Sequence, residues 1–328
     1  MPEPLVSIIF SVHNNEHSIV KCLECLAKQK YRNIELIVID DFSTDRTPEL
    51  IASSLQRFDS PHHIRNERQI GEGKSLNKGI EVSRGEFIYF IAGDIYTEVD
   101  SLLEAVRFLQ SQPANTIAVM GSVYNYDRSY WSMVRHATWF GGIQKKVIRK
   151  IHSCARCNTL MRRSVFNQGD RFTGNIRSGD VEFSSRLTDK GYDLLYFPKL
   201  RAWHDHPHSW LDHASLMKRA AKGYVESRTH YTNMHYNYIK NRLLFLVLLP
   251  FLPLGSTLKK VLNGNQRDIL MRYPLLAPAV LVGQVLFWYY VAKEYRREIR
   301  KGQGGHAEKG NGSEIAAQEH IDPGRFNQ

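Results

Sequence analysis

The sequence predicts an α/β fold in which a mostly parallel sheet carries helices on both faces. Two observations predict it. Continuous apolar runs of strand length recur through the first 125 residues, and helix-like segments separate them. The runs lack the apolar/polar alternation of a half-exposed strand, which is typical of parallel strands covered on both faces. With 42% hydrophobic residues among 328, the chain can bury such a core.

The predicted elements of the first 125 residues alternate between strand and helix. They are strand 5–12, helix 16–29, strand 34–40, a helix within 43–56, helix 73–83, strand 86–93, helix 98–110 and strand 116–121. Ser43 or Thr44 can cap the second helix, and Pro48 lies early in it, where proline is tolerated. Strand and helix alternate five times, which implies a parallel sheet with crossover helices.

The rest of the chain differs in composition and divides it into four parts. Segment 157–166 is expected to be a strand that turns into a short helix, and a helix from about 178 should stop at Gly191 before another strand. We expect a nucleotide-binding half at 1–125, an acceptor-side half at 126–238, apolar helices at 239–300 and a disordered, Gly-rich tail at 301–328.

Polar side chains follow three of the predicted parallel strands. They are Ser11 to Glu16, the pair Asp40 and Asp41, and Asp94. Ligands of open α/β sheets bind beyond the carboxyl ends of the strands, so these side chains are expected in one crevice. Lys74 opens a predicted helix and can contact phosphate or carboxylate there. The surrounding "GEGKSLN" is not a phosphate loop, because Arg68 stands where that motif needs glycine.

The formal net charge of +11 predicts an anionic partner. Nine Lys or Arg and no Asp or Glu occur in 128–163, together with Trp131, Trp139 and Phe140. This stretch is either a solvated basic face with core aromatics or a surface that meets lipid headgroups or a phosphate-linked acceptor. No nucleic-acid recognition motif accompanies the charge, so we expect no nucleic-acid partner.

Four cysteines form two Cys-x-x-Cys pairs, Cys22/Cys25 and Cys154/Cys157. Zinc sites built from two such pairs usually hold them about 15–20 residues apart, and here the gap is far longer. Buried free thiols are the favoured interpretation, with zinc as the alternative. Free thiols and an opening without a secretory-signal pattern predict a reducing cytoplasm.

Two apolar segments mark the last third of the chain. Segment 243–255 contains two prolines and is too short for a straight membrane span, whereas 274–293 carries no charge before its final Lys and has the length of a spanning helix. Trp288 to Tyr290 would form an interfacial belt. Membrane attachment is favoured over a buried hydrophobic hairpin, although span, re-entry and surface binding all remain open.

Residues 5 to 205 resemble family 2 glycosyltransferases, which have the nucleotide-sugar-binding fold called GT-A. The resemblance rests on "VSIIFSVHNNEHSIVKCLECLAKQKYRNIELIVIDDFSTDRT" and "GKSLNKGI". It implies that Ser11 and His13 contact the nucleotide base, with His13 in place of the usual Tyr. It also implies that Asp41 accepts a hydrogen bond from the base N–H, and Glu16 is a weaker candidate for the same pocket.

The family usually ends its fourth strand with Asp-x-Asp, and here the triplet is Ala92-Gly93-Asp94. The resemblance implies that Asp94 holds a divalent cation, Mn or Mg, on the donor diphosphate, while the ribose-binding aspartate is missing. His204, in "AWHDH", matches a second metal ligand. His206 and His208 would bind acceptor phosphate, although closely spaced histidines also occur in plain polar loops.

A second landmark of the family is an acidic pair before a helix, which reads Gly179-Asp180 here, with Glu182 following. Asp180 matches the general base. The resemblance thus implies an inverting, metal-dependent transferase that takes sugar from a nucleotide-diphosphate sugar. We expect a lipid-linked or saccharide acceptor at an anionic membrane surface, on the cytoplasmic face, in envelope polysaccharide or glycolipid synthesis. Because Ala92 and Gly179 depart from the pattern, a non-catalytic binding or scaffolding subunit is the alternative.

Overall fold

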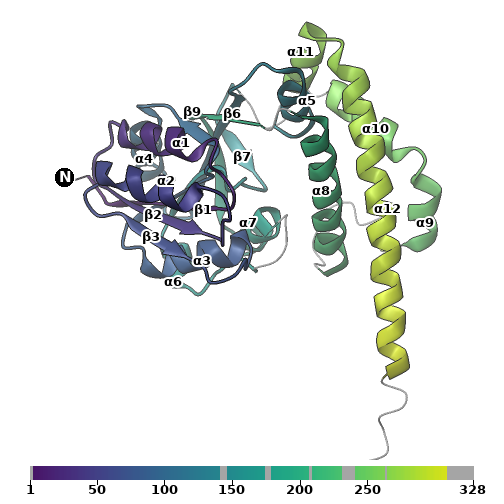
Figure 1. Cartoon of the computed structure of the whole chain (residues 1–328), viewed down its shortest axis with the longest axis horizontal. Helices are drawn as coiled ribbons and strands as arrows, with labels where there is room; N and C mark the ends of the chain where they lie inside the picture. The colour runs from purple at the N-terminus through teal and green to yellow at the C-terminus, as the bar shows by residue number, and fades with distance from the viewer. Residues whose placement is uncertain are drawn as a thin grey trace, which may run out of the picture.

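The structure is a computed structural model that describes residues 3–140, 146–173, 179–206, 209–230, 241–262 and 264–308. It consists of a sheet domain and a layer of helices that stands beside it (Figure 1). The donor-side residues predicted from the sequence all belong to the sheet domain.

The described residues form a nine-stranded sheet in the order β3-β2-β1-β4-β8-β6-β9-β5, with β7 on β9. The strands are β1 (Val6–Val12), β2 (Ile34–Asp40), β3 (His62–Arg65), β4 (Phe87–Ile91), β5 (Ile95–Thr97), β6 (Thr116–Asn125), β7 (Arg149–Ile151), β8 (Asn158–Arg162) and β9 (Asp193–His204). Strands β3, β2, β1 and β4 are parallel, and β8 runs antiparallel to both β4 and β6. The carboxyl ends of β1, β2 and β4 therefore meet at one edge.

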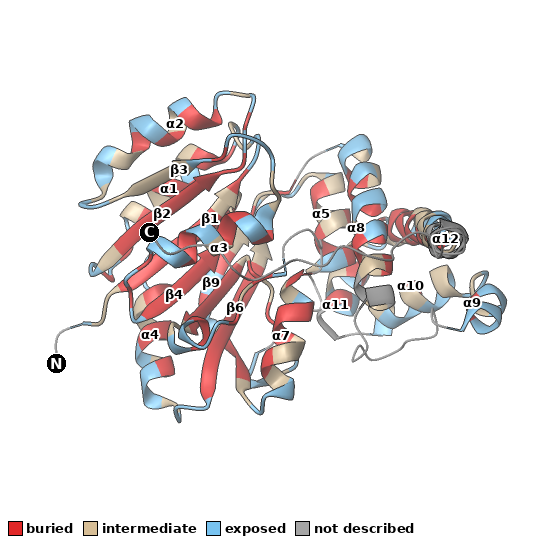
Figure 2. Cartoon of the chain, turned by 90° about the horizontal axis from the view of Figure 1, so that it is seen from below, coloured by how far each residue is buried: buried red, intermediate tan, exposed pale blue. Residues whose placement is uncertain are grey.

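Helices cover both faces of this sheet, as the sequence predicts (Figure 2). One face packs on α1 (Ile19–Ala27), α2 (Thr47–Ser54) and α4 (Ser101–Ser111), and the other packs on α3 (Glu72–Val82), α6 (Ser164–Asn167) and α7 (Gly179–Asp189). A short 3₁₀ turn, Leu55–Arg57, follows α2. Side chains from alternate positions of β1 reach the two cores, Ile8 and Phe10 into one and Ile9 into the other. The α/β fold class is confirmed.

The predicted stop of α7 at Gly191 also holds. Gly191 has a φ of +85°, and its N–H donates to the carbonyl of Thr188. This left-handed conformation ends helices most readily at glycine, and it turns the chain into β9.

The sequence analysis did not predict the shortest strands. Segments β3, β5 and β7 have three or four residues each, with sequences HHIR, IYT and RKI. Such segments have too few residues for a periodic signal, and the neighbouring strand fixes their conformation instead.

The helical layer comprises α5 (Tyr130–Trp139), α8 (Trp210–His230), α9 (Arg242–Leu248), α10 (Leu252–Leu262), α11 (Gly264–Arg272) and α12 (Leu276–Glu308). One small core joins α8 to α12, and a second joins α5 to α11 and α12. Helix α12 continues past residue 300, where the sequence predicted a disordered tail. Residues 309–328 of that tail lie outside the described residues.

Within the described ranges, one helix is long and apolar enough to cross a membrane, residues Leu276–Arg300 of α12. Helices α9 and α10 pass the same test only as a pair, and they are bent by 68°. In α12, 44% of the most apolar window is buried against the rest of the chain. A core helix can have this composition too, so membrane attachment stays a prediction.

Candidate functional site

Loops after β1 and β2 form one side of the site. The backbone N–H of Asn14 donates to the Ser43 hydroxyl at 3.0 Å, and a ring nitrogen of His13 lies 3.0 Å from the carbonyl of Asp41. Asn14 has a φ of +54°, a conformation that asparagine tolerates better than most residues. The His13 side chain is exposed and Ser11 is half-buried. Both predicted base contacts therefore border an open edge of the sheet.

Asp41 is buried, and its carboxylate holds the loop before α3. One oxygen accepts from the Asn66 amide and the Ile70 N–H, each at 2.9 Å, and the other accepts from the Gly71 N–H at 2.8 Å. A carboxylate has about four acceptor directions. Three are used, so Asp41 can accept one more hydrogen bond from a ligand.

Glu16 and Lys74, the other two residues predicted to bind the donor, differ in whether their charged groups already have partners. Glu16 accepts a hydrogen bond from the backbone N–H of Arg46 at 3.2 Å, so its carboxylate already fastens the first loop to the second. Lys74 is exposed in the first turn of α3, and its ammonium has no hydrogen bond or ion pair within the described chain. Lys74 is therefore the more available of the two.

Asp94 lies between β4 and β5, at the end of the buried strand, and its side chain is 26% exposed. A side chain at Gly93 would place its Cβ 2.6 Å from Val12, so β1 and this turn approach too closely for another residue. Ala92 packs against the hydrophobic core. The position where the family carries its first aspartate is thus filled by apolar packing.

His204 at the end of β9 lies beside Asp94, with 3.6 Å between its Nε2 and Asp94 Oδ1. Burial lowers the pKa of His204, and the nearby Asp94 carboxylate opposes that shift. The ring stacks on His206 at 4.1 Å between centroids, and the buried His204 Nδ1 has no hydrogen-bond partner among the described residues. His208 lies outside the described residues.

A neutral imidazole beside a carboxylate suits a divalent cation, so Asp94 and His204 fit the predicted metal pair. No group of three or more His, Cys, Asp or Glu side chains in the described chain can hold a metal ion. The four cysteines form no disulfide. Two protein ligands leave most of the coordination of such an ion to other molecules.

Asp180 occupies the first turn of α7 and is half-buried. The neighbouring Glu182 is only 2% exposed, accepts from the Thr173 hydroxyl at 2.9 Å and forms an ion pair with Arg186. The two carboxylates therefore have separate tasks. The Glu182 carboxylate is occupied by Thr173 and Arg186, so Asp180 is the better candidate for a chemical role.

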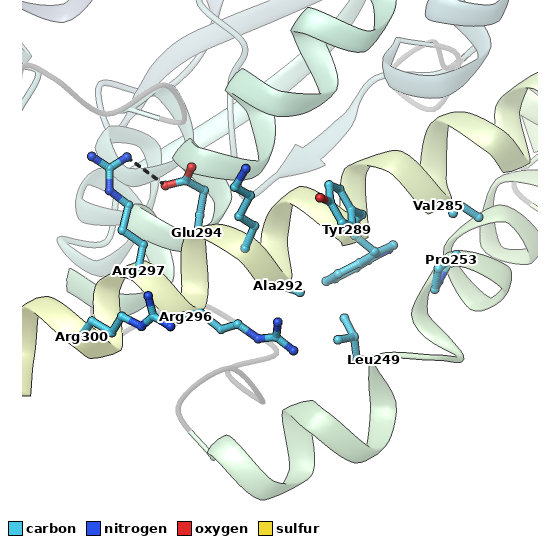
Figure 3. Close-up of a pocket in the computed structure, with 11 residues that line it drawn as sticks. Leu249, Pro253, Val285, Tyr289, Ala292, Glu294, Arg296, Arg297 and Arg300 are labelled. Atoms are coloured by element: carbon cyan, nitrogen blue, oxygen red, sulfur yellow. Dashed lines mark ion pairs between the residues drawn. The ribbon is translucent and has the colours of Figure 1, made fainter.

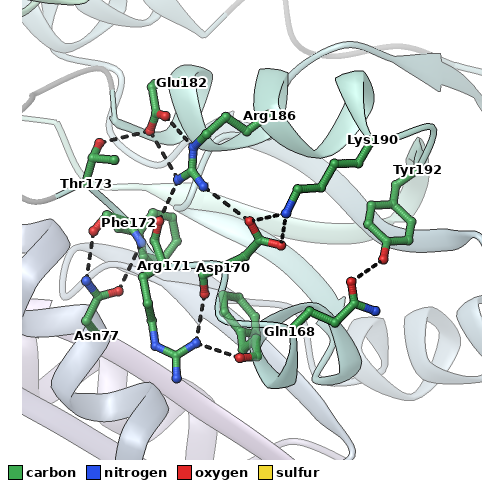
Figure 4. A network of polar contacts seen from close by, with 11 residues as sticks. Asn77, Gln168, Asp170, Arg171, Phe172, Thr173, Glu182, Arg186, Lys190 and Tyr192 are labelled. Carbon is green, nitrogen blue, oxygen red and sulfur yellow. Dashed lines mark hydrogen bonds and ion pairs between the residues drawn. The ribbon is translucent and has the colours of Figure 1, made fainter.

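A polar network fixes the base of α7 (Figure 4). Buried Asp170 forms ion pairs with Arg186 at 3.3 Å and Lys190 at 2.7 Å. The Asn77 side chain, from α3, donates to the Phe172 carbonyl at 2.8 Å and accepts from its N–H at 3.1 Å. The network thus ties α7, and Asp180 with it, to the donor half of the domain.

Arg156 is a site residue that the sequence analysis missed. It is 8% exposed and forms an ion pair with Glu72 at 2.8 Å, and its Nη1 lies 3.4 Å from the place a Cβ of residue 179 would occupy. Burial alone would lower the pKa of Arg156, but the carboxylates of Glu72 and Asp180 hold it above the ordinary value. A buried cation thus stands beside the missing side chain of Gly179.

The adjacent Cys157 has a thiol whose pKa both acidic candidates affect. Burial raises the pKa of its thiol, and the carboxylates of Asp180 and Asp94 raise it further, so both lie within electrostatic reach. The start of α7 lies beside the 154–157 loop, because the Cβ position of residue 179 is 3.4 Å from Arg156 Nη1 and the Cys154 N–H donates to the Ser184 hydroxyl at 3.0 Å.

Comparison with known proteins points to one family. Residues 7–169 match the model of the glycosyl transferase family 2. The chain is 31% identical over 125 residues to "Glycosyltransferase GlyG" of Streptococcus pneumoniae, which covers 38% of this chain and 41% of that protein. It is 26% identical over 209 residues to the "Beta-monoglucosyldiacylglycerol synthase" of Nostoc sp., covering 60% and 44%. The chain thus spans less than half the length of these two relatives.

A solved structure supports the fold over nearly the whole chain. It is the mannosyltransferase PcManGT from Pyrobaculum calidifontis in complex with GDP-Man and Mn²⁺, with a TM-score of 0.61 and 16% identity. The match covers 91% of this chain and 88% of that one. At this identity the likeness establishes the GT-A fold alone.

Proposed function

We propose that this chain is an inverting transferase acting on a nucleotide-diphosphate sugar. The premise is its membership of glycosyltransferase family 2, whose model matches residues 7–169. One observation carries the proposal. Asp94 and His204 lie side by side, with 3.6 Å between His204 Nε2 and Asp94 Oδ1, and Asp180 stands in the first turn of α7. This arrangement supports a cation held by one oxygen ligand and one nitrogen ligand, with a separate carboxylate as the base.

In the proposed reaction, Asp180 takes the proton of an acceptor hydroxyl. That oxygen attacks the anomeric carbon from the face opposite the diphosphate, and a new C–O bond forms. The bond from the anomeric carbon to the diphosphate oxygen breaks, and the nucleoside diphosphate leaves with its electron pair. A single displacement of this kind inverts the anomeric configuration.

Asp94 and His204 would hold a divalent cation, Mn or Mg, with donor oxygens as its other ligands. When bound, such a cation neutralises charge on the leaving diphosphate. The PcManGT complex contains both Mn²⁺ and the nucleotide sugar GDP-Man, which supports this assignment. With two protein ligands, we expect weak cation binding before the donor arrives.

The donor's base and phosphates are assigned to the β1 and β2 edge. Ser11 and His13 border it, Asp41 retains one acceptor direction for a base N–H, and Lys74 is free to meet phosphate. Glu16 belongs to the same pocket as a loop-fastening residue.

The proposed acceptor is lipid-linked or saccharide, presented at the cytoplasmic face of an anionic membrane. The name of the Nostoc relative supports a glycolipid acceptor. Exposed apolar side chains on α9 and α10 support attachment to a membrane.

A non-catalytic subunit remains the alternative, because Ala92 packs into the core and Gly179 has no side chain. Nucleotide release from UDP-, GDP- and dTDP-sugars, measured with Mn²⁺ or Mg²⁺, decides between the two. A scaffolding subunit would release no nucleotide from any of them.

Asp180→Asn sharpens the test, because the amide keeps the size but cannot take a proton. We expect transfer to fall by about 10²-fold or more while donor binding, measured by calorimetry, is retained. Asp59→Asn, at an exposed loop position, is the matched control. Loss of donor affinity in the Asp180 variant would instead place this residue on the donor side.

A further inference from the structure

The C-terminal helices form an open cavity whose lining includes none of the proposed catalytic residues. It has a volume of about 940 Å³, within the range of small-molecule sites, and lies between α12 and the α9–α10 pair (Figure 3). In Figures 1 and 2, α9 and α12 stand at the end of the molecule away from the sheet. The cavity is therefore not part of the acceptor crevice.

The break between α9 and α10 creates this space. The two helices bend by 68°, and Pro253 is the second residue of α10, in the first turn, where proline fits. Helix α12 passes the bend without a break, so the two surfaces diverge. Ala292 lines the gap with only a methyl group.

The lining changes character along α12. One end is apolar, with Leu249, Pro253, Val285 and Trp288. The other end is basic, and a smaller adjoining cavity of about 320 Å³ shares Arg296 and Arg300 with it and adds Arg242. The space is thus an apolar channel with a cationic mouth.

The basic end has spare charge. Arg297 forms an ion pair with Glu294 at 3.8 Å, but no acidic side chain of the described residues pairs with Arg242, Arg296 or Arg300. Guanidinium groups bind phosphate with two parallel hydrogen bonds. Three unpaired guanidinium groups at one mouth favour a phosphate-bearing ligand.

The surroundings of the channel are apolar and exposed. Phe251 and Leu254 on the α9–α10 pair are 67% and 64% exposed, and Val285 and Tyr289 on α12 are 52% and 60% exposed. Soluble monomers rarely expose so many large apolar side chains together. A nucleic acid or free phosphate would leave this surface in water, whereas a membrane lipid would cover it.

We propose that this channel binds one anionic phospholipid of the membrane, with an acyl chain along Leu249, Val285 and Trp288 and the phosphate between Arg242, Arg296 and Arg300. The bound lipid orients the catalytic domain on the bilayer. The inference rests on α9 to α12 alone and does not require sugar transfer.

Vesicle flotation of the full chain tests the phosphate end. Arg296→Gln combined with Arg300→Gln should weaken binding to phosphatidylcholine vesicles containing phosphatidylglycerol by roughly fivefold per arginine. Arg267→Gln combined with Arg272→Gln, two exposed arginines of α11, makes the same charge change outside the channel. This control should lose clearly less binding, and equal losses in both pairs would overturn the site in favour of diffuse attraction.

Acyl-chain occupancy is tested by fluorescence quenching with phospholipids brominated in the acyl chain. Quenching of tryptophan fluorescence by the brominated lipid should be lost in Trp288→Phe, which removes the fluorophore in the channel. Ala292→Phe should reduce the quenching, because the larger side chain fills the channel without changing any charge. Thermal unfolding reports whether each variant is folded. Unchanged quenching in a folded Ala292→Phe variant would overturn the acyl-chain assignment.

An assay of nucleotide-sugar hydrolysis in detergent tests the proposed function separately from lipid binding. The Arg296 and Arg300 double variant should hydrolyse nucleotide sugar at the wild-type rate, because neither residue touches the catalytic crevice. Lipid binding without any hydrolysis in wild type would leave the lipid site standing and remove the transferase proposal.

Discussion

The sheet domain and the helical layer use arginine in opposite ways. In the basic stretch 128–163, Arg156 is buried against Glu72, and Arg162 donates to three backbone carbonyls. On α12, Lys293, Arg296, Arg297 and Arg300 are all exposed. The stretch that looked most like a membrane surface in the sequence therefore directs several of its cations inward. The shorter basic run near the end of the chain displays them.

Apolar side chains show the reverse distribution. The sheet domain buries its apolar runs in two cores, whereas α9 and α10 leave Leu243, Val247, Phe251 and Leu254 largely exposed. We infer a division of labour in which the sheet domain performs the chemistry and the helical layer meets the membrane. Substitutions in one part should leave the other part's property intact.

The largest expected effect is that of Asp94→Ala. Without this carboxylate the metal pair is reduced to His204, so metal-dependent turnover should be abolished. Mn²⁺ binding in the presence of nucleoside diphosphate, followed by electron paramagnetic resonance, should also be lost. Binding to anionic vesicles should not change, and a loss there would contradict the separation of the two parts.

Arg162→Met should cost the sheet domain about 2–4 kcal/mol of unfolding free energy. The Arg162 side chain donates to the carbonyls of Leu109 and Gln112 at the end of α4 and to that of Thr116 at the start of β6. Chemical denaturation measures the loss. Lys146→Met removes an exposed cation of the same stretch and should change stability by no more than about 0.5 kcal/mol. Comparable losses in both variants would mean that the inward cations contribute no more than the exposed ones.

Much of the sheet domain could be predicted from the sequence because its signals are local. The apolar run 34–40 coincides with β2, and α7, Gly191 and β9 follow in the predicted order. The orientation of single cations is not a local property. Arg156 is buried because Glu72 and Asp180 approach it from other elements, and the sequence "CARC" contains no sign of either.

Site prediction had the same limit. The resemblance pointed to Asp94, His204 and Asp180, and the fold was needed to show that Asp94 lies beside His204. The hydrogen bonds that the Asp41 carboxylate accepts could not be predicted either. Two of them come from the backbone N–H groups of Ile70 and Gly71, in a loop without any sequence motif.

A moderate effect is expected from Phe251→Ser combined with Leu254→Ser. Both side chains are mostly exposed, so unfolding free energy should change little. Retention on membranes in high salt should fall, because burial of apolar surface is not screened by salt. Val82→Ser with Val99→Ser, two exposed apolar positions of the sheet domain, is the control and should leave retention unchanged.

Point substitutions suit this comparison better than truncation near residue 238. Leu216, Met217 and Val225 of α8 pack against α12, so removal of α12 would expose this core. A truncated chain would then bind vesicles through surface that is buried in the whole protein.

The smallest expected effect is on how the stability of the sheet domain depends on pH. Burial pushes the pKa of Glu35 upward, but hydrogen bonds from the Ser7 hydroxyl, Arg84 and the Gly85 N–H outweigh it and leave that pKa below its ordinary value. A lowered folded-state pKa stabilises the protein above the unfolded pKa, about 4.3, and the contribution disappears as pH falls through the folded-state pKa.

Glu35→Gln should therefore cost about 1–2 kcal/mol at neutral pH, and the difference from wild type should shrink in acid. Denaturation across pH measures it, with Glu104→Gln, half of an exposed pair with Lys199, as a control near zero. A difference between Glu35→Gln and wild type that stays constant down to acid pH would show that the Glu35 carboxylate does not couple the stability of the sheet domain to pH.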